Sequence, residues 1–115
     1  MAIDIKAVQA LNMWRVATVA GVKKDAPDLS ARQMAILLTI YLTQPPHTVR
    51  GLAQTLSISK PAITRALDRL GHYGLTKRKK DETDQRSILV QRTVKGSVFL
   101  REFGDMIVQA AHETE

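Results

Sequence analysis

Hydroxyl and cationic side chains gather on one face of the helix predicted over residues 59–73. At 100° per residue, Pro61, Thr64, Arg65 and Asp68 fall on the side opposite an apolar row. Threonine and arginine hydrogen-bond to the edges of bases, and arginine also pairs with phosphate. Three of these residues occupy the amino-terminal half of the helix, which is the half that a recognition helix inserts into the major groove. The spacing therefore predicts contact with duplex DNA.

A preceding helix and a tight turn are expected to position this face. Residues 48–73 have the pattern of a helix-turn-helix, in which Thr48 caps the first helix and Ile58 fills the turn. Ser59 is the predicted N-cap of the second helix, whose first turn tolerates a proline because that N–H needs no partner. Gly74 is expected to end this helix in the left-handed conformation. The inward row of the helix is apolar and consists of Ile63, Ala66, Leu67 and Leu70.

A basic hairpin is predicted directly after this helix, over residues 75–92. The segment alternates like two strands, 75–80 and 87–92, around a charged loop. A hairpin of this kind beside a helix-turn-helix forms a wing, which places a loop next to the recognition helix on the DNA. Its acidic residues stand among lysines and indicate a charged turn rather than a catalytic cluster: Asp81, Glu82 and Asp84.

The positive charge of the chain is concentrated in these two motifs. The protein has 115 residues and a formal net charge of +6. Residues 48–95 hold 11 Lys or Arg against 4 Asp or Glu, whereas the other 67 residues hold 6 against 7. This concentration is the electrostatic footprint of a protein that binds a polyanion. The alternative is a solvated basic face that has no partner.

Helices before and after this module complete the predicted fold. An apolar-rich helix is predicted over residues 3–20, with Gly21 able to end it, and a last helix over 94–111 behind a Thr93 cap. Between them, Ser30 and the glutamine three residues later form a capping-box pattern that opens another helix. The predicted fold is one domain over all 115 residues, mainly α with a small antiparallel β-hairpin. It is a winged helix-turn-helix of about five helices plus a wing.

The first helix presents a broad apolar stripe, and in the last helix apolar residues recur at helical spacing. In residues 3–20 the apolar positions cover more of the surface than the narrow row that packs against one core. This breadth indicates contact with a second subunit, and burial within the protein's own core is the alternative. Trp14 is expected to be buried at the core or at the dimer seam. The predicted interface residues are Leu11, Trp14, Phe99, Phe103 and Met106.

Composition excludes several other classes of function. The chain has no cysteine, which excludes disulfides, thiolate metal sites and cysteine nucleophiles, and fits a cytoplasmic location. His47, His72 and His112 lack the spacing of metal ligands. The glycines are dispersed and form no phosphate-binding loop. The sequence predicts no catalytic residues, no metal, no cofactor, no signal peptide and no membrane span.

The order of these motifs resembles one protein family. The segment AITRALDRLGHYGLTKRKKDETDQRSILVQRTVKG resembles the winged-helix core of the MarR family of bacterial transcriptional regulators. The shared features are a helix ending in LDRL, a following glycine, a basic strand, an Asp-x-Arg at Asp84 to Arg86, and an apolar strand ending at Thr93. The resemblance covers about residues 28–105 and depends on the order and spacing of all these pieces.

The resemblance implies a homodimer that reads a pseudo-palindromic operator in double-stranded DNA. By position, Arg86 is the wing arginine expected in the minor groove, where negative potential is concentrated. Asp84 would hold the wing or orient Arg65 or Arg69. The lysines of the hairpin would contact phosphates. The implied DNA-binding residues are Ser59, Lys60, Pro61, Thr64, Arg65, Arg69, Lys77, Lys79, Lys80 and Arg86.

This chain is short for the family, whose long terminal helices dimerise and often frame a pocket for a small aromatic or phenolic effector. Helices 3–20 and 94–111 would form a reduced interface. The sequence is compatible both with the presence and with the absence of an effector pocket. Two other functions are alternatives: a winged-helix module that binds proteins, and an architectural protein that binds DNA without sequence preference. Arg65 has a structural alternative too, an ion pair with Asp68 one turn later. For Asp68 itself an intramolecular pair is favoured over base contact, because phosphate repels an acid.

Overall fold

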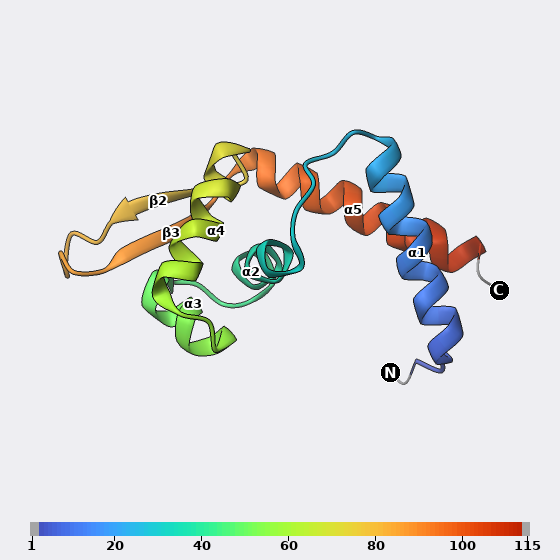
Figure 1. Cartoon of the computed structure of the whole chain (residues 1–115), viewed down its shortest axis with the longest axis horizontal. Helices are drawn as coiled ribbons and strands as arrows, with labels where there is room; N and C mark the ends of the chain where they lie inside the picture. Colours follow the sequence, from blue (N-terminus) through green and yellow to red (C-terminus); the bar gives the residue numbers. More distant parts are fainter. Residues whose placement is uncertain (1–2, 114–115) are drawn as a thin grey trace. The chain divides into compact units, whose positions relative to one another are not determined.

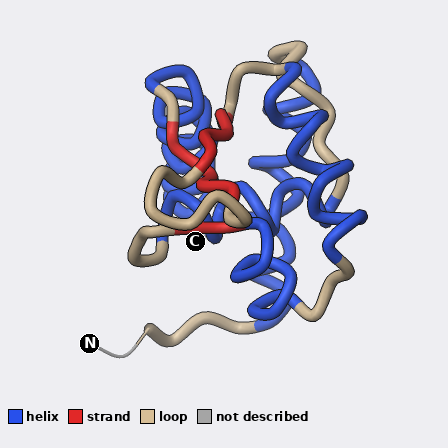
Figure 2. The backbone as a smooth tube through the Cα atoms, turned by 90° about the vertical axis from the view of Figure 1, so that its left-hand side faces the viewer, coloured by secondary structure: helices blue, strands red, loops and turns tan. Residues whose placement is uncertain are grey.

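The computed structural model describes residues 3–113, in which five helices and three short strands follow one another. The predicted fold class is confirmed, and in Figure 2 helices make up most of the chain while the strands are short. The chain divides into two compact units: the winged-helix core of residues 29–99, and the terminal unit of residues 1–28 with 100–115. In chain order the elements are α1 (Ala7–Lys23), α2 (Ala31–Leu42), β1 (His47–Thr48), α3 (Val49–Leu56), α4 (Lys60–His72), β2 (Thr76–Lys80), β3 (Ile88–Arg92) and α5 (Val94–Glu113).

Within the winged-helix core, α4 packs against both α2 and α3 (Figure 1). The predicted capping box of α2 is present, because Gln33 N donates to Ser30 Oγ and Ser30 N donates to Gln33 Oε1. The inward row of α4 is buried as predicted. The buried residues of α2 are Ile36, Leu37 and Ile40. The completely buried large side chains are Ile36, Leu37, Ile40, Leu52, Ile63, Leu67, Leu70 and Leu75.

The helix-turn-helix forms through local hydrogen bonds that the sequence encodes. Thr48 Oγ1 accepts from Gly51 N at 2.9 Å and begins α3, as expected for its cap. Ser57 ends α3 in the left-handed conformation with φ 54°, and Ile58 N then donates to Ala53 O at 3.0 Å. Ser59 caps α4 by accepting from Ala62 N at 3.3 Å. These bonds satisfy backbone groups that each helix end would otherwise leave unpaired.

Gly74 ends α4 as predicted. Its φ is +75°, Leu75 N donates to Leu70 O, and Gly74 N donates to Gly71 O, each at 2.9 Å. This pair of bonds is the Schellman motif, which needs a residue in the left-handed region. The chain then turns directly into β2, so the end of α4 sets where the hairpin starts.

The wing belongs to a three-stranded antiparallel sheet with the order β1-β3-β2. The hairpin pairs Thr76 with Arg92 and Lys80 with Ile88, close to the predicted strands. The sequence prediction missed β1, in which His47 pairs with Val90 and the next residue pairs with Leu89. A strand of two residues has too few positions to show alternation. Its effect is to join the start of the helix-turn-helix to the second strand of the wing.

The terminal unit corrects the predicted first helix. Helix α1 spans Ala7–Lys23 instead of residues 3–20, and Gly21 lies inside it. An interior glycine costs only about 1 kcal/mol relative to alanine, so it need not stop a helix. The residue that adopts the left-handed conformation after α1 is Asp25, with φ 57°, and Ala26 N donates to Gly21 O. The last helix likewise runs two residues beyond the predicted 111, to Glu113.

Two small residues are completely buried in the terminal unit, Ala17 and Ala110. Trp14 and Phe103 meet edge to face, with ring centroids 5.6 Å apart and an interplanar angle of 82°. Trp14 is still 51% exposed, so the expected burial of this side chain is not achieved within one copy of the chain. No helix in residues 3–113 is both long enough and apolar enough to cross a membrane.

Candidate nucleic-acid interface

The outward face of α4 is polar, cationic and open to solvent. Pro61, Thr64, Arg65 and Asp68 are all exposed, whereas the residues between them are buried against α2 and α3. Ser59 and the lysine that follows it are exposed at the amino-terminal end of the same helix. The face predicted from 100° spacing therefore exists as a continuous strip along the helix.

Arg65 is available for an external partner. Among residues 3–113 the structure shows no hydrogen bond or ion pair to its side chain, and it is exposed. The alternative of an Arg65–Asp68 pair is wrong, because Asp68 pairs with Arg78 instead. An acid was expected to pair within the chain at this position, and that expectation is confirmed with a different partner.

The Asp68–Arg78 pair joins α4 to the wing. Arg78 Nη2 lies 2.6 Å from Asp68 Oδ1, and the two side chains are 34% and 61% exposed. Solvent screens a pair of this exposure, so its contribution to stability is small, about 0 to 1 kcal/mol. Its geometric effect is to tie β2 to the outer side of α4. The sequence prediction missed Arg78, because ten positions separate the two residues and no local spacing relates them.

Arg69 flanks the outward face, and its guanidinium lies over the ring of Tyr73, 5.1 Å from the centroid. A cation in this position is attracted by the negative face of the ring. The stacking directs the side chain along the carboxyl end of α4. Arg69 therefore projects from a different part of the helix than Arg65, which lies one turn earlier.

The hairpin sorts its basic residues onto two faces. Lys77 and Lys79 alternate with Arg78 and Lys80 along β2, and side chains of a strand alternate between its faces. Arg78 faces α4, so Lys80 shares that face and the other two lysines lie on the opposite one. The described residues offer no hydrogen bond or ion pair to any of the three lysines. The predicted group of three lysines is therefore split between two directions.

Two acidic residues organise the loop of the wing. Asp81 Oδ1 accepts from the Thr83 hydroxyl at 2.8 Å and from Thr83 N at 3.0 Å. These hydrogen bonds, that of the hydroxyl first, hold the pKa of the Asp81 carboxyl below its ordinary value of 3.8. Asp84 Oδ1 accepts from Arg86 N at 3.1 Å, and Asp84 Oδ2 accepts from the Ser87 hydroxyl at 3.3 Å. The charged turn inferred from the sequence is thus a hydrogen-bonded loop.

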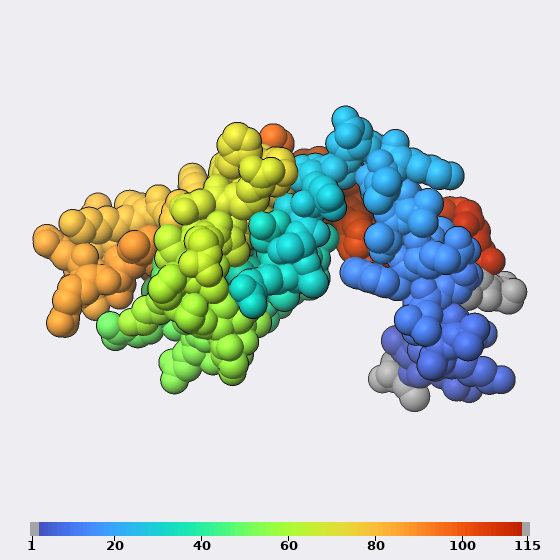
Figure 3. Space-filling model, viewed as in Figure 1, coloured from blue at the N-terminus to red at the C-terminus, as the bar shows by residue number. Residues whose placement is uncertain are grey.

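Arg86 extends from this loop into solvent. Its side chain is 91% exposed, and its Nε lies 3.7 Å from Asp84 Oδ1. Asp84 therefore contacts the wing itself, through Arg86 and Ser87, and no contact with Arg65 or Arg69 is present among the described residues. In the space-filling view the loop projects past α3 and α4 at the edge of the winged-helix core (Figure 3).

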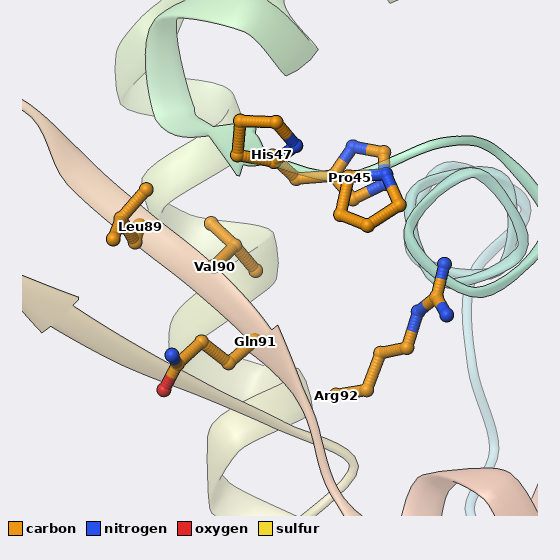
Figure 4. Close-up of a pocket in the computed structure, with 7 residues that line it drawn as sticks. Pro45, His47, Leu89, Val90, Gln91 and Arg92 are labelled. Carbon is orange, nitrogen blue, oxygen red and sulfur yellow. The ribbon is translucent and has the colours of Figure 1, made fainter.

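A shallow pocket of about 260 Å³ lies beside the sheet of the winged-helix core. Figure 4 shows that its Arg92 side chain is directed toward α2. The guanidinium donates from Nε to Ile40 O at 2.9 Å and from Nη2 to Thr43 O at 3.0 Å. The pocket is lined by Pro45, Pro46, His47, Leu89, Val90, Gln91 and Arg92. In the part of the chain that is described, no three His, Asp or Glu residues are grouped to hold a metal ion.

Apolar side chains remain exposed on α1 in the terminal unit. Leu11 is 68% exposed and Val8 is 77% exposed, one turn apart on the same helix. Of the other predicted interface residues, Phe99, Phe103 and Met106 are half-buried. The structure holds one copy of the chain, so their role in a dimer stays a prediction.

The fold and the exposed basic strip define a winged helix-turn-helix protein. A sequence model of the MarR family matches residues 29–88, which is more than half of the chain. The chain therefore belongs to the MarR family, a family of transcriptional regulators. No curated protein sequence matches the chain.

Several solved structures have a similar fold. A transcriptional regulator from Thermotoga maritima matches with a TM-score of 0.71 at 21% identity, covering 92% of this chain and 69% of that one. A mutant S. aureus MepR bound to an oligodeoxyribonucleotide matches with a TM-score of 0.77 at 20% identity, covering 90% and 74%. A mutant MarR from E. coli complexed with operator DNA matches with a TM-score of 0.68 at 25% identity, covering 91% and 69%.

Proposed function

We propose that this chain is a sequence-specific, duplex-DNA-binding regulator that acts as a homodimer and represses transcription by occluding a pseudo-palindromic operator. The observation that carries the proposal is the exposed strip of α4 together with the projecting wing. Arg65 and the three hairpin lysines point to solvent without partners among the described residues, and Arg86 is 91% exposed. Cationic groups left unpaired on a reading helix and a wing are suited to base edges and phosphates.

The MepR and MarR structures bound to DNA support this proposal, because the winged-helix core of this chain has their fold. Two copies related by a two-fold axis would place their α4 helices on half-sites about 10 bp apart. A regulator of this kind acts where the bacterial chromosome is, in the cytoplasm. No catalytic role is proposed for the chain.

Selection of binding sites from random duplex DNA at near-physiological salt tests the proposal. The wild-type chain and Arg86→Ala are selected in parallel. We expect the wild type to enrich a palindrome and Arg86→Ala to bind it more weakly, because the wing arginine is lost from the minor groove. Binding without enrichment would make the chain an architectural DNA-binding protein. No binding to any duplex would contradict the proposal and favour a protein-interaction module.

A further inference from the structure

One hydroxyl group holds both ends of the wing. The Tyr41 hydroxyl of α2 donates to Leu75 O at 2.7 Å and accepts from Thr93 N at 2.8 Å. Leu75 is the residue just before β2, and Thr93 is the residue just after β3. The hydroxyl has one proton to donate, and the 3.2 Å distance to Thr93 O is the longer of its two carbonyl contacts. The hairpin is therefore pinned at its base to α2.

Neighbouring contacts reinforce this junction within the winged-helix core. Thr93 Oγ1 donates to Gly74 O at 2.7 Å and accepts from Gly96 N at 2.9 Å. A side chain on Gly96 would overlap the Tyr41 hydroxyl and the Leu75 carbonyl oxygen, so only glycine lets α5 begin so close to Tyr41. The Arg92 guanidinium, which bonds to Ile40 O and Thr43 O, also lies 5.9 Å from the centroid of the Tyr41 ring.

We propose that Tyr41 is a positioning residue that sets the angle of the wing, so that Arg86 and α4 meet the same DNA site together; this rests on the proposed DNA binding. The five residues of β2 span about 16 Å at about 3.3 Å each. A tilt of about 10° at the base therefore displaces the tip by about 3 Å, comparable to the length of a hydrogen bond. The base junction thus decides whether the tip reaches its groove.

The variant Tyr41→Phe tests this role because it removes only the hydroxyl. Tyr73→Phe is the matched control, since no hydrogen bond of the Tyr73 hydroxyl is present among the described residues and its ring lies in the same module. We expect Tyr41→Phe to weaken binding to the selected operator about fivefold to tenfold, because DNA binding must then hold a wing that the lost hydrogen bonds, of about 1 kcal/mol each, no longer fix in position. Tyr73→Phe is expected to change the affinity less than twofold.

Double variants distinguish a positioning role of Tyr41 from a general loss of structure. In an Arg86→Ala background, Tyr41→Phe should have less than a twofold further effect, because the tip no longer contributes. In an Arg65→Ala background it should keep its full effect. Equal losses in the two backgrounds would overturn the proposal and make Tyr41 an ordinary structural residue.

Amide hydrogen exchange in the free protein tests the junction without DNA. Tyr41→Phe should speed exchange of the Thr93 amide and of the paired hairpin amides about tenfold, whereas amides in the middle of α4 keep their protection. Unchanged exchange in the hairpin would overturn the proposal. Failure of the wild type to bind any duplex would defeat the proposed function instead, and the exchange result would still decide the role of Tyr41.

Discussion

Arg78 of β2 and Asp68 of α4 form an ion pair, with Nη2 and Oδ1 2.6 Å apart, and so tie the wing to the recognition helix. Because the carboxylate of Asp68 is engaged in this pair, the Arg65 side chain on the same face has no hydrogen-bond or ion-pair partner among residues 3–113. The pair has a structural role that the charge pattern alone did not reveal. It neutralises an acid on a surface that otherwise presents positive charge.

We expect the Asp68–Arg78 pair to contribute little free energy of unfolding. A double-mutant cycle of Asp68→Asn and Arg78→Gln should give a coupling energy of about 0.5 kcal/mol in urea denaturation, falling in 1 M salt. The pair of Asp84→Asn and Arg86→Gln serves as control, since those atoms are 3.7 Å apart and coupling should be near zero. A coupling of about 2 kcal/mol or more for Asp68 and Arg78 would contradict this view of a solvent-screened pair.

Arg65 and Lys79 are expected to affect DNA binding differently. Arg65→Ala should relax sequence preference, costing about 1 to 3 kcal/mol on the operator and less on other DNA, because the lost contacts are to base edges. Lys79→Ala should weaken all sequences similarly and reduce the slope of log affinity against log salt by about 1. Titrations of operator and scrambled duplexes at several salt concentrations measure both effects. Uniform, equal losses from the two variants would defeat the assignment of α4 as the reading helix.

Leu11→Glu should prevent dimerisation without unfolding the chain. Leu11 is 68% exposed, so a charge there is hydrated in the monomer and becomes unfavourable only when a second subunit covers it. Leu42→Glu is the matched control, because Leu42 is 75% exposed on α2 of the winged-helix core. Sedimentation velocity should show a monomer for the first variant and a dimer for the second. A dimer that survives Leu11→Glu would move the interface away from this face of α1.

Gly96→Ala should destabilise the protein by about 1 to 3 kcal/mol, as overpacking of a tight contact does. The added methyl group would meet the Tyr41 hydroxyl and the Leu75 carbonyl. Gly104→Ala, in the same helix with nothing within 4 Å of the added atom, should instead stabilise by about 0.5 to 1 kcal/mol. Thermal and urea unfolding of the two variants measure the contrast, and equal effects would show that the contact at Gly96 relaxes easily.

Order in the wing loop should depend on pH only in acid. The folded state favours the charged form of Asp81, whose pKa is lowered from 3.8. The contribution of the Asp81 carboxylate to the order of the wing loop is therefore fully present above pH 3.8 and is lost as the pH falls through the lower pKa of the folded state. The Thr83 amide resonance should shift below about pH 4 and not above it. Thr83→Val should raise the pH midpoint of the shift at the residue-83 amide toward 3.8, whereas Glu82→Gln should leave that midpoint unchanged. A wild-type midpoint above 3.8 would contradict a lowered pKa for Asp81.

Local signals in the sequence predicted the order of the helices, their N-caps and the outward face of α4, although the bounds of α1 and the end of α5 differ from the prediction. Ser30, Thr48 and Ser59 cap as predicted because an N-cap involves residues only two or three positions apart. The apolar spacing of α4 likewise placed its buried row without reference to any other element. The basic hairpin followed from alternation and charge.

Only the tertiary structure decided which distant residues meet. Asp68 and Arg78, the strand β1, and the junction of Tyr41 with Leu75 and Thr93 all join positions whose separation in sequence has no periodic signature. Arg92 shows this most clearly, since by composition it is one more positive charge, whereas in the fold it donates to Ile40 O and Thr43 O. Its partners are backbone carbonyls, and every residue carries one, so residue types alone could not identify the contact.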